Sequence, residues 1–321
     1  MKILITGGGG FLGFRLAKTL LARGKLGGKA ISGITLLDGA FPPGVEGLQK
    51  VKAVTGDVSD EKTIAGACTP DTEAVFHLAA VVSGQAESDF DLGMRVNLKG
   101  MELLLAQMRK CAKPPRLVYT SSVAAFGGTL PDVLDDSTLA NPQTSYGAQK
   151  VIGEYLVSDY TRKGFIDGRA LRLPTIVVRA GKPNAAASSF ASGVIREPLN
   201  GVVSECPVAA ETGVWLLSPG KVVDAFIHAW ELPAEAWGTQ RWLNLPGITA
   251  TVAEMVDAMR KVAGDAVAKR VVYKADARIQ AIVKTWPVNF RTPRALAMGF
   301  KPDADVESVI RDYIADEKIK V

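Results

Sequence analysis

The sequence of 321 residues has little cysteine and histidine: Cys68, Cys111, Cys206, His77 and His228 are all it contains. The cysteines lie far apart and form no Cys-x-x-Cys pair, so we expect reduced thiols, as in a cytoplasmic protein. Neither histidine has another histidine or a cysteine at ligand spacing. The sequence therefore predicts no zinc site and no bound metal.

Long apolar runs and blocks of one charge are also missing. No apolar run approaches the roughly 18 residues of a membrane span, and the N-terminus enters an apolar strand directly, without room for a signal peptide. The net charge of +5 comes from 38 Lys and Arg against 33 Asp and Glu, and no basic block reaches five residues. Such dispersed charge favours a solvated mixed surface, so we expect neither a nucleic-acid nor a membrane partner.

The composition that remains is that of a folded globular protein. Hydrophobic residues make up 47% and charged residues 22% of the chain, which excludes collagen-like, coiled-coil and disordered classes. Short apolar runs alternate with segments of helical period through the first half, which is typical of a doubly wound parallel sheet. The predicted strands are Lys2–Thr6, Gly33–Asp38, Ala74–Leu78, Arg116–Thr120 and Ala170–Val178. The predicted helices are Phe11–Leu21, Lys62–Ala67, Leu92–Cys111 and Ser145–Thr161.

After about Arg179 the pattern changes to loops rich in Gly, Pro, Ser and Ala, with shorter helices. Thr251 and Glu254 fit a capping box at the start of one of them. The predicted elements are helices Ala186–Arg196, Val252–Val262, Val306–Tyr313 and Lys221–Trp230 and strand Arg241–Leu245. We expect an α/β chain with one domain over residues 1–180, returns to it at about 221–246, and a smaller lobe over 181–321.

A glycine-rich turn joins the first strand to the first helix. Gly7, Gly10 and Gly13 satisfy one phosphate-binding spacing, while the four consecutive glycines at 7–10 also allow Gly8-x-Gly10-x-x-Gly13, so the register stays open. A helix N-terminus offers unpaired N–H groups and a partial positive charge, and glycines let a pyrophosphate approach them. The pattern predicts a dinucleotide site.

Two carboxylates extend this prediction. Asp38 ends the second strand, where a carboxylate can accept hydrogen bonds from both adenosine ribose hydroxyls. It favours NAD, because a 2′-phosphate would meet it as a like charge. Asp57 follows another short apolar run and could lie near the adenine amino group, although an ordinary turn fits equally well.

An acid/base pair opens a predicted helix. Tyr146 and Lys150 are four residues apart and share a helix face, so the ammonium can favour the phenolate that a base requires. Ser121 and Ser122 end a predicted strand, at the carboxyl edge where open α/β sheets bind ligands. One of these hydroxyls can hold a substrate oxygen while Tyr146 exchanges its proton.

Together these residues resemble the extended short-chain dehydrogenase/reductases, also called the NAD-dependent epimerase/dehydratase family. The resemblance covers most of the chain and rests on motifs in one order. They are Thr6-Gly7-x-x-Gly10-x-x-Gly13, Asp38, Gly56-Asp57, His77-Leu78-Ala79-Ala80, Asn97, Thr120-Ser121-Ser122, Tyr146-x-x-x-Lys150 and Leu171-Arg172-Leu173-Pro174.

The resemblance implies a Rossmann domain with a C-terminal substrate lobe, NAD as cofactor, and roles for particular residues. Ser122 takes the family's catalytic hydroxyl, Tyr146 its acid/base role, and Lys150 its ribose-binding role, which also lowers the pKa of the tyrosine. His77 is then structural. The implied cofactor contacts are Gly7, Gly10, Phe11, Leu12, Gly13, Asp38, Asp57, Val58, Leu78, Ala79, Ala80, Asn97, Lys150, Pro174 and Ile176.

The motifs also narrow the reaction. Dehydratases of the family carry Thr-Asp-Glu where this chain has Thr120-Ser121-Ser122, so the acid and base for water elimination are missing. Arg179, Lys182 and Arg196 lie near small hydroxyl residues and suit the carboxylate of a small sugar acid. This segment resembles a branch that oxidises the C2 hydroxyl of a four-carbon sugar acid with NAD, which implies D-erythronate as substrate.

Candidate substrate contacts are Ser83, Ser122, Tyr146, Arg179, Ser188 and Arg196. The cations could equally be surface charges or lie in the interface of a homo-oligomer, a dimer or tetramer, which we also expect. A nucleotide-sugar epimerase remains the alternative function because epimerases keep the same catalytic residues. A non-catalytic redox sensor and an RNA-binding relative of the fold fit less well, because the catalytic set is intact and the charge is dispersed.

Overall fold

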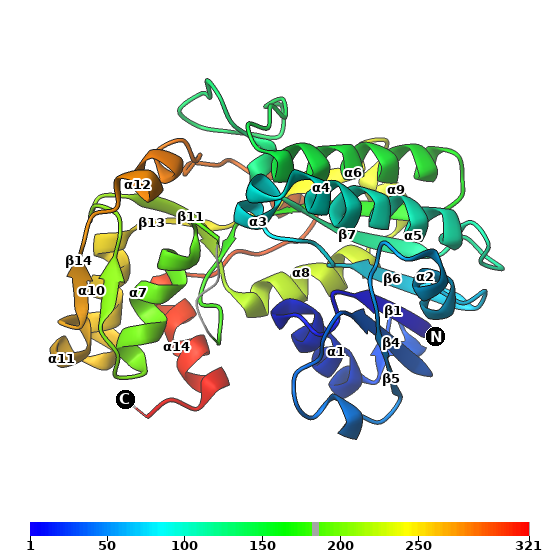
Figure 1. Ribbon diagram of the computed structural model, residues 1–321, viewed down its shortest axis with the longest axis horizontal. Helices are drawn as coiled ribbons and strands as arrows, with labels where there is room; N and C mark the ends of the chain where they lie inside the picture. Colours follow the sequence, from blue (N-terminus) through cyan, green and yellow to red (C-terminus); the bar gives the residue numbers. More distant parts are fainter. Residues whose placement is uncertain (182–185, 321) are drawn as a thin grey trace. The chain divides into compact units, whose positions relative to one another are not determined.

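A parallel sheet organises the part of the chain that the computed structural model describes, residues 1–181 and 186–320 (Figure 1). Over these residues it has seven strands in the order β12-β8-β7-β6-β1-β4-β5. Pairing is parallel from β5 through β4, β1 and β6 to β7. The strands are β1 (Lys2–Thr6), β4 (Gly33–Asp38), β5 (Val51–Thr55), β6 (Thr72–His77), β7 (Arg116–Ser122), β8 (Asp167–Leu173) and β12 (Trp242–Asn244).

This order confirms the doubly wound fold. The chain leaves β1 toward β4 and β5 and then returns to the other side of β1 as β6, so the strand order reverses between β1 and β6. Ligands of such sheets bind at the carboxyl ends of the strands beside this reversal. The predicted strand Ala170–Val178 divides into β8 and β9 (Thr175–Ile176), because Pro174 between them has no N–H to continue the ladder.

By its internal contacts the chain forms two compact units. The first comprises Met1–Ala125, Thr144–Arg172 and Val223–Leu243, and the second comprises Phe126–Gln143, Leu173–Val222 and Asn244–Val321. Helices that lie wholly or mainly in the first unit are α1 (Phe11–Arg23), α2 (Glu61–Ala67), α3 (Ser83–Ser88), α4 (Phe90–Gly93), α5 (Gly100–Met108), α6 (Ser145–Arg162), α8 (Pro219–Glu231) and α9 (Ala234–Trp237).

Two layers of helices cover the sheet of the first unit. On one face Leu4, Val75 and Leu117 pack with α2, α5 and α6. On the other face α1 buries Leu16 and Leu20, and Figure 1 shows α1 and α6 on opposite sides of the strands. Because side chains alternate along a strand, successive residues of β7 point to different layers. This alternation separates Ser121 from Ser122.

The predicted helix Leu92–Cys111 was wrong as a single element. The structure divides it into α4, a π-helical turn η2 (Met94–Lys99) and α5, which ends at Met108. The wider turn is stabilised by Asn97, whose amide bonds the backbone of Val81 and the side chain of Gln149. Such π turns inside α-helices occur frequently at functional sites. Two short 3-10 turns complete the unit, η1 (Val45–Gly47) and η3 (Val123–Ala125), with a hairpin of β2 (Lys25–Leu26) and β3 (Lys29–Ala30).

The second unit has its own core around α7, α10 and α14, with Val194, Met255 and Ile310 buried in it. Its capping box at Thr251 and Glu254 is confirmed. Strand β11 pairs with β9 and β13, and β10 pairs with β14. Apart from β9 the elements are α7 (Ser189–Leu199), β10 (Ser204–Cys206), β11 (Gly213–Leu217), β13 (Ile248–Thr251), α10 (Val252–Ala263), α11 (Asp265–Ala268), β14 (Val271–Tyr273), α12 (Ala277–Val283), α13 (Pro293–Ala297) and α14 (Val306–Glu317).

Within the described residues, no helix combines the length and the apolar character that a membrane span requires.

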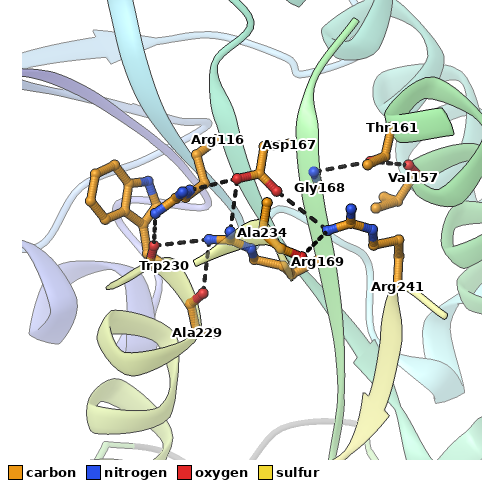
Figure 2. Close-up of polar contacts among 10 residues, drawn as sticks. All are labelled: Arg116, Val157, Thr161, Asp167, Gly168, Arg169, Ala229, Trp230, Ala234 and Arg241. Atoms are coloured by element: carbon orange, nitrogen blue, oxygen red, sulfur yellow. Dashed lines mark hydrogen bonds and ion pairs between the residues drawn. The ribbon is translucent and has the colours of Figure 1, made fainter. Parts of the chain in front are cut away.

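Three arginines surround one carboxylate at the amino ends of β7 and β8 (Figure 2). Asp167 accepts from Arg116 Nε at 2.8 Å, from Arg169 Nη2 at 2.8 Å and from Arg241 Nη1 at 3.4 Å. Arg169 is fully buried. Burial lowers its pKa to about 9, and the charge of Asp167 opposes that shift. The carboxylate therefore compensates a cation that has no access to water.

Two of these arginines bind the C-terminal end of α8. Arg169 Nη1 donates to the carbonyls of Ala229 and Trp230, and Arg116 Nη1 donates to Trp230 as well. The last carbonyls of a helix have no partner within it and carry partial negative charge. The arginine cluster therefore ties α8 to the starts of two central strands.

Substitution of Asp167 by alanine should lower the free energy of unfolding by about 3 kcal/mol, because it leaves buried Arg169 without its ion pair. Asp159→Ala is the matched control, since Asp159 pairs with Arg162 on the exposed surface of α6 and should cost no more than about 1 kcal/mol. Urea unfolding of both variants measures the difference. Equal losses would contradict a structural role of the cluster.

Candidate active site

The glycine-rich turn brings the end of β1 against the start of α1. Gly7 has φ +70°, and a Cβ there would lie 2.7 Å from the backbone nitrogen of Ala79. A Cβ on Gly13 would lie 2.1 Å from the Gly7 oxygen. Both positions therefore require glycine for the fold itself. At Gly10, the exposed N-cap of α1 with no capping side chain, the nearest atom to a Cβ would be the Gly7 oxygen at 3.2 Å.

Gly10 therefore leaves space over the first turn of α1, where backbone N–H groups have no partner within the helix. Phe11 and Leu12 form this turn and are half-buried. A Cβ on Gly8 would lie 2.8 Å from Leu36 Cβ, so Gly8 is required by the fold as well, and both phosphate-binding spacings stay open. A pyrophosphate fits this cradle because the missing side chain lets it reach the N–H groups.

Asp38 lies beside this cradle at the end of β4. Its Oδ2 accepts from the Gly9 backbone nitrogen at 3.0 Å, and its Oδ1 accepts from Ala40 at 3.4 Å. The carboxylate is half-buried. The glycine turn and Asp38 thus form one structure, as a site for a dinucleotide phosphate and its adenosine ribose requires.

The other predicted cofactor residues in the first unit follow β5 and β6. Asp57 bonds Ser59 and pairs with Arg95; although burial acts to raise the pKa of Asp57, these hydrogen bonds lower it. Val58 is buried. Leu78, Ala79 and Ala80 follow directly after β6 and are half-buried.

Asn97 connects this segment to the helix that carries Tyr146. Its Oδ1 accepts from the Val81 nitrogen at 2.8 Å, and its Nδ2 donates to the Val81 oxygen at 3.2 Å and to Gln149 Oε1 at 2.8 Å. The side chain is buried. In this structure the Asn97 amide thus holds the loop after β6 in register with α6.

Tyr146 and Lys150 lie on the first turns of α6, which begins after Thr144 as N-cap. The Lys150 Nζ is 5.5 Å from the centroid of the Tyr146 ring and 4.9 Å from that of Tyr119. It donates to the Thr120 carbonyl at 2.7 Å. Burial lowers the pKa of Lys150 to about 7, and the charge of Glu154 opposes this shift.

The structure distinguishes the two serines. Ser121 is buried, and its hydroxyl donates to Glu154 Oε1 at 2.5 Å. Ser122 is half-buried, and its Oγ accepts from the Ala124 nitrogen at 3.1 Å. The Ser122 hydroxyl therefore keeps its proton for another acceptor. Since η3 directly after Ser122 packs against α6, Ser122 lies at the end of β7 that is next to the helix carrying Tyr146.

His77 is buried at the end of β6, and its Nδ1 lies 2.6 Å from Thr6 Oγ1. Burial lowers its pKa to about 3, and the positive charge of Lys150 acts in the same direction. The imidazole is thus neutral at physiological pH, and its ring stacks on Tyr119. These contacts match those of a structural residue.

Several predicted contacts belong to the second unit, where a chain of hydrogen bonds connects them. Ser192 donates to the Ile176 oxygen and accepts from the Arg179 nitrogen. Arg196 donates to the Arg179 oxygen at 2.9 Å and pairs with Glu197 at 2.6 Å. Arg196 is buried, so its charge is already compensated by its neighbour in the chain.

The remaining candidates have less informative surroundings. Pro174 separates β8 from β9, and Ser188 directly precedes α7. Ser83 opens α3 in the first unit and is half-buried. Lys182 lies outside the described residues. Among those residues, no group of three or more His, Cys, Asp or Glu is arranged to hold a metal.

Sequence reasoning missed the carboxylate that contacts Ser121. Glu154 is four residues after Lys150, so the helical spacing that joined Tyr146 to Lys150 also predicts Glu154 on the same face. Its partner Arg172 lies in the Leu171-Arg172-Leu173-Pro174 motif, but the motif implied no role for this arginine. Gln149, the partner of Asn97, had no signal in the sequence because the two residues meet only after folding.

The NAD dependent epimerase/dehydratase family matches this chain over residues 3–232. The chain belongs to this family and uses NAD as its cofactor.

Individual relatives agree with this class. The chain is 57% identical to the D-erythronate dehydrogenase of Cupriavidus necator, over 98% of both chains. It is 43% identical to the D-erythronate dehydrogenase of Haemophilus influenzae, over 98% of this chain and 99% of the relative. A crystal structure described as a nucleoside-diphosphate-sugar epimerase from Agrobacterium tumefaciens superposes with a TM-score of 0.93 at 40% identity, over 99% of this chain and 94% of that one.

Acid should destabilise the protein through His77, whose folded-state pKa of about 3 lies below its ordinary 6.5. The unfolded chain takes up a proton below pH 6.5 that the folded chain excludes, so this contribution is complete above pH 6.5 and is lost as the pH falls toward 3. At pH 5 the loss is about 2 kcal/mol. His77→Asn should be less sensitive to acid by this amount in urea unfolding at pH 7 and pH 5.

Thr6→Val is the matched control, because it removes the hydrogen bond but keeps the imidazole. It should retain the acid sensitivity of the unmodified protein. If His77→Asn lost as much stability between pH 7 and pH 5 as the unmodified chain, the imidazole would not be the responsible group.

Proposed function

We propose that this chain is an NAD-dependent D-erythronate dehydrogenase, which oxidises the C2 hydroxyl of D-erythronate to 2-oxo-D-erythronate. The observation that supports the reaction type is the Lys150 ammonium 5.5 Å from the Tyr146 ring centroid, on a helix that packs against β7, the strand that ends with Ser122. The substrate is inferred from the 57% identity to the D-erythronate dehydrogenase of Cupriavidus necator over nearly the whole chain.

Tyr146 is the proposed base. A free phenol has a pKa near 10 and is a poor base at neutral pH. A cation 5.5 Å from the centre of the ring, as the Lys150 ammonium is, favours the phenolate by about 3 kcal/mol at an effective dielectric of ~20, before desolvation costs. The phenolate takes the proton of the C2 hydroxyl, while the Ser122 hydroxyl donates to the same oxygen and holds it in place.

NAD supplies the hydride acceptor when it is bound. The first turn of α1 at Gly10 would hold its pyrophosphate, and Asp38 its adenosine ribose. Leu78, Ala79 and Ala80 would line the cofactor, and Lys150 would donate to its second ribose. Asp57 and Val58 would lie near the adenine, and Pro174 and Ile176 near the nicotinamide amide.

The substrate carboxylate requires a cation or a dense set of donors about one carbon beyond the reacting centre. Arg179 and Arg196 are the proposed partners. The Arg196 guanidinium also pairs with Glu197 and binds the Arg179 backbone, so it holds the Arg179 segment in position as well. Ser83 and Ser188 are the proposed contacts of the remaining hydroxyls.

A nucleotide-sugar epimerase is the second candidate, favoured by the 40% identity to the protein from Agrobacterium tumefaciens described as one. The same Ser122, Tyr146 and Lys150 would serve it. The two functions differ in substrate charge and size, because a sugar acid presents a carboxylate where an epimerase substrate presents a diphosphate. Location in the cytoplasm and assembly into a dimer or tetramer stay predictions.

The substrate assignment predicts that the purified protein reduces NAD with D-erythronate far better than with erythritol, which lacks the carboxylate. Loss of one charge-assisted contact costs about 1.5–3 kcal/mol, so kcat/KM should fall by about 10- to 150-fold. Absorbance of NADH measures both rates. Tyr146→Phe should abolish turnover while its NAD affinity stays nearly unchanged.

If the protein converted a UDP-sugar but formed no NADH from any erythronate or threonate isomer, the assignment as a dehydrogenase would be wrong. The epimerase would then be the better assignment. If Tyr146→Phe kept more than about a tenth of the unmodified kcat, another group would carry the proton.

Asp38 should make the enzyme prefer NAD over NADP by at least about 10-fold in kcat/KM, because an unpaired like-charge contact with the 2′-phosphate costs more than about 1.4 kcal/mol. Asp38→Ala should lower the ratio of kcat/KM with NAD to kcat/KM with NADP. The two cofactors compared on the same enzyme preparation provide the control. Equal use of both by the unmodified protein would show that Asp38 does not face the ribose.

A further inference from the structure

A buried ion pair lies one helical turn beyond Lys150. Arg172 on β8 donates to Glu154 on α6 through Nε to Oε1 at 2.8 Å and through Nη2 to Oε2 at 2.6 Å. Glu154 is 1% and Arg172 is 5% exposed at the side chain. The Ser121 hydroxyl from β7 donates to the same Oε1 at 2.5 Å. Glu154 thus joins three elements that meet at the catalytic edge.

This arrangement compensates the charge of the Glu154 carboxylate. A buried carboxylate is costly unless it is paired and hydrogen-bonded, and Glu154 has both a two-point guanidinium contact and a hydroxyl donor. Two-point contacts of this kind are among the strongest that a protein makes. A neutral glutamine could accept from Ser121 but could not compensate Arg172. The buried guanidinium and the carboxylate therefore require each other.

The charged and titratable groups facing the Lys150 ammonium come from four elements. Tyr146 and Glu154 are on its own helix, one turn away on either side. Tyr119 on β7 lies under it, and the neutral His77 on β6 stacks on Tyr119. Arg172 on β8 is held beyond Glu154. Glu154 is the acidic residue of this group.

We propose that Glu154 is a positioning residue for the reaction, which keeps the Lys150 ammonium charged and fixes the end of β7 from which Ser122 projects. The inference deepens the proposed dehydrogenase and rests on it for the roles of Lys150 and Ser122. Its two effects have separate physical origins. The charge acts on Lys150 through space, whereas the hydrogen bond to Ser121 acts on the orientation of the next residue of the strand.

Burial and Glu154 act on Lys150 in opposite directions. Burial lowers the pKa of Lys150 to about 7, and the Glu154 charge opposes that shift. Without the carboxylate the pKa falls further, so the ammonium loses its proton at a lower pH. Tyr146 then loses the cation that favours its phenolate, and a ribose loses a charged donor.

The test compares Glu154→Gln, Glu154→Asp and Ser121→Ala across pH 6–9. In Glu154→Gln the alkaline limb of kcat/KM with D-erythronate should move to lower pH by about one unit or more, for a charge one helical turn away. Glu154→Asp keeps the charge and should restore the limb of the unmodified enzyme. Ser121→Ala keeps the charge but removes the hydrogen bond, so kcat should fall several-fold with the limb in place.

NAD affinity measured by calorimetry over the same pH range provides a readout without substrate. Its alkaline limb should move with that of kcat/KM in Glu154→Gln. If the unmodified protein failed to oxidise D-erythronate, the proposed function would fall, while this binding profile would still test Glu154. Because Glu154→Gln removes the carboxylate that compensates the charge of buried Arg172, the double variant Glu154→Gln/Arg172→Gln serves if the single variant does not fold. It should show a smaller shift in the same direction.

A merely structural ion pair predicts a different result. Glu154→Gln or the double variant would then lower the melting temperature while both pH profiles stayed where they are in the unmodified protein. That outcome overturns the proposal, as does a shift of the limb in Ser121→Ala equal to that in Glu154→Gln.

Discussion

The burial of one ammonium group determines how the catalytic edge is built. Burial removes the Lys150 ammonium from water. Its partners in the fold are the Thr120 carbonyl, two aromatic rings and the nearby Glu154 carboxylate. Glu154 in turn requires Arg172, which is supplied by the next strand. Thus the position of α6 over β7 and β8 follows from compensating charges as well as from apolar packing. A cation held in this way is close to losing its proton at neutral pH. The protonated fraction of such a group changes most in response to small changes in its surroundings.

The two ends of the sheet have different roles in the first unit. At the amino ends of β7 and β8, Arg116 and Arg169 bind the last turn of α8, and the Asp167 carboxylate pairs with both of them. At the carboxyl ends of β1, β4 and β7, side chains and backbone donors remain accessible to a ligand. Stabilising ion pairs at the first end leave the second free for chemistry. A parallel sheet permits this separation because all its strands end on one side.

Much of the site could be predicted because its signals are local. Gly7, Gly10 and Gly13 surround a single turn. Tyr146 and Lys150 share a helix face, and their spacing of four residues can be read directly from the sequence. The ion pair of Glu154 with Arg172 and the bond of Asn97 to Gln149 are different, because each joins residues from separate elements. Their geometry depends on how α6, β8 and η2 pack, and no periodicity in the chain encodes it.

By itself the sequence determined the alternation of strands and helices, the phosphate cradle and the tyrosine-lysine pair, since each depends on neighbours within a few residues. The tertiary structure decided between alternatives that neighbouring residues could not separate. Ser121 and Ser122 are equivalent in sequence, but strand alternation and the Glu154 carboxylate bury one and leave the other available. Arg196 is likewise paired only in the folded chain, where its guanidinium is buried beside Glu197. Which hydroxyl remains available depends on what is buried beside it, and burial is a property of the folded chain.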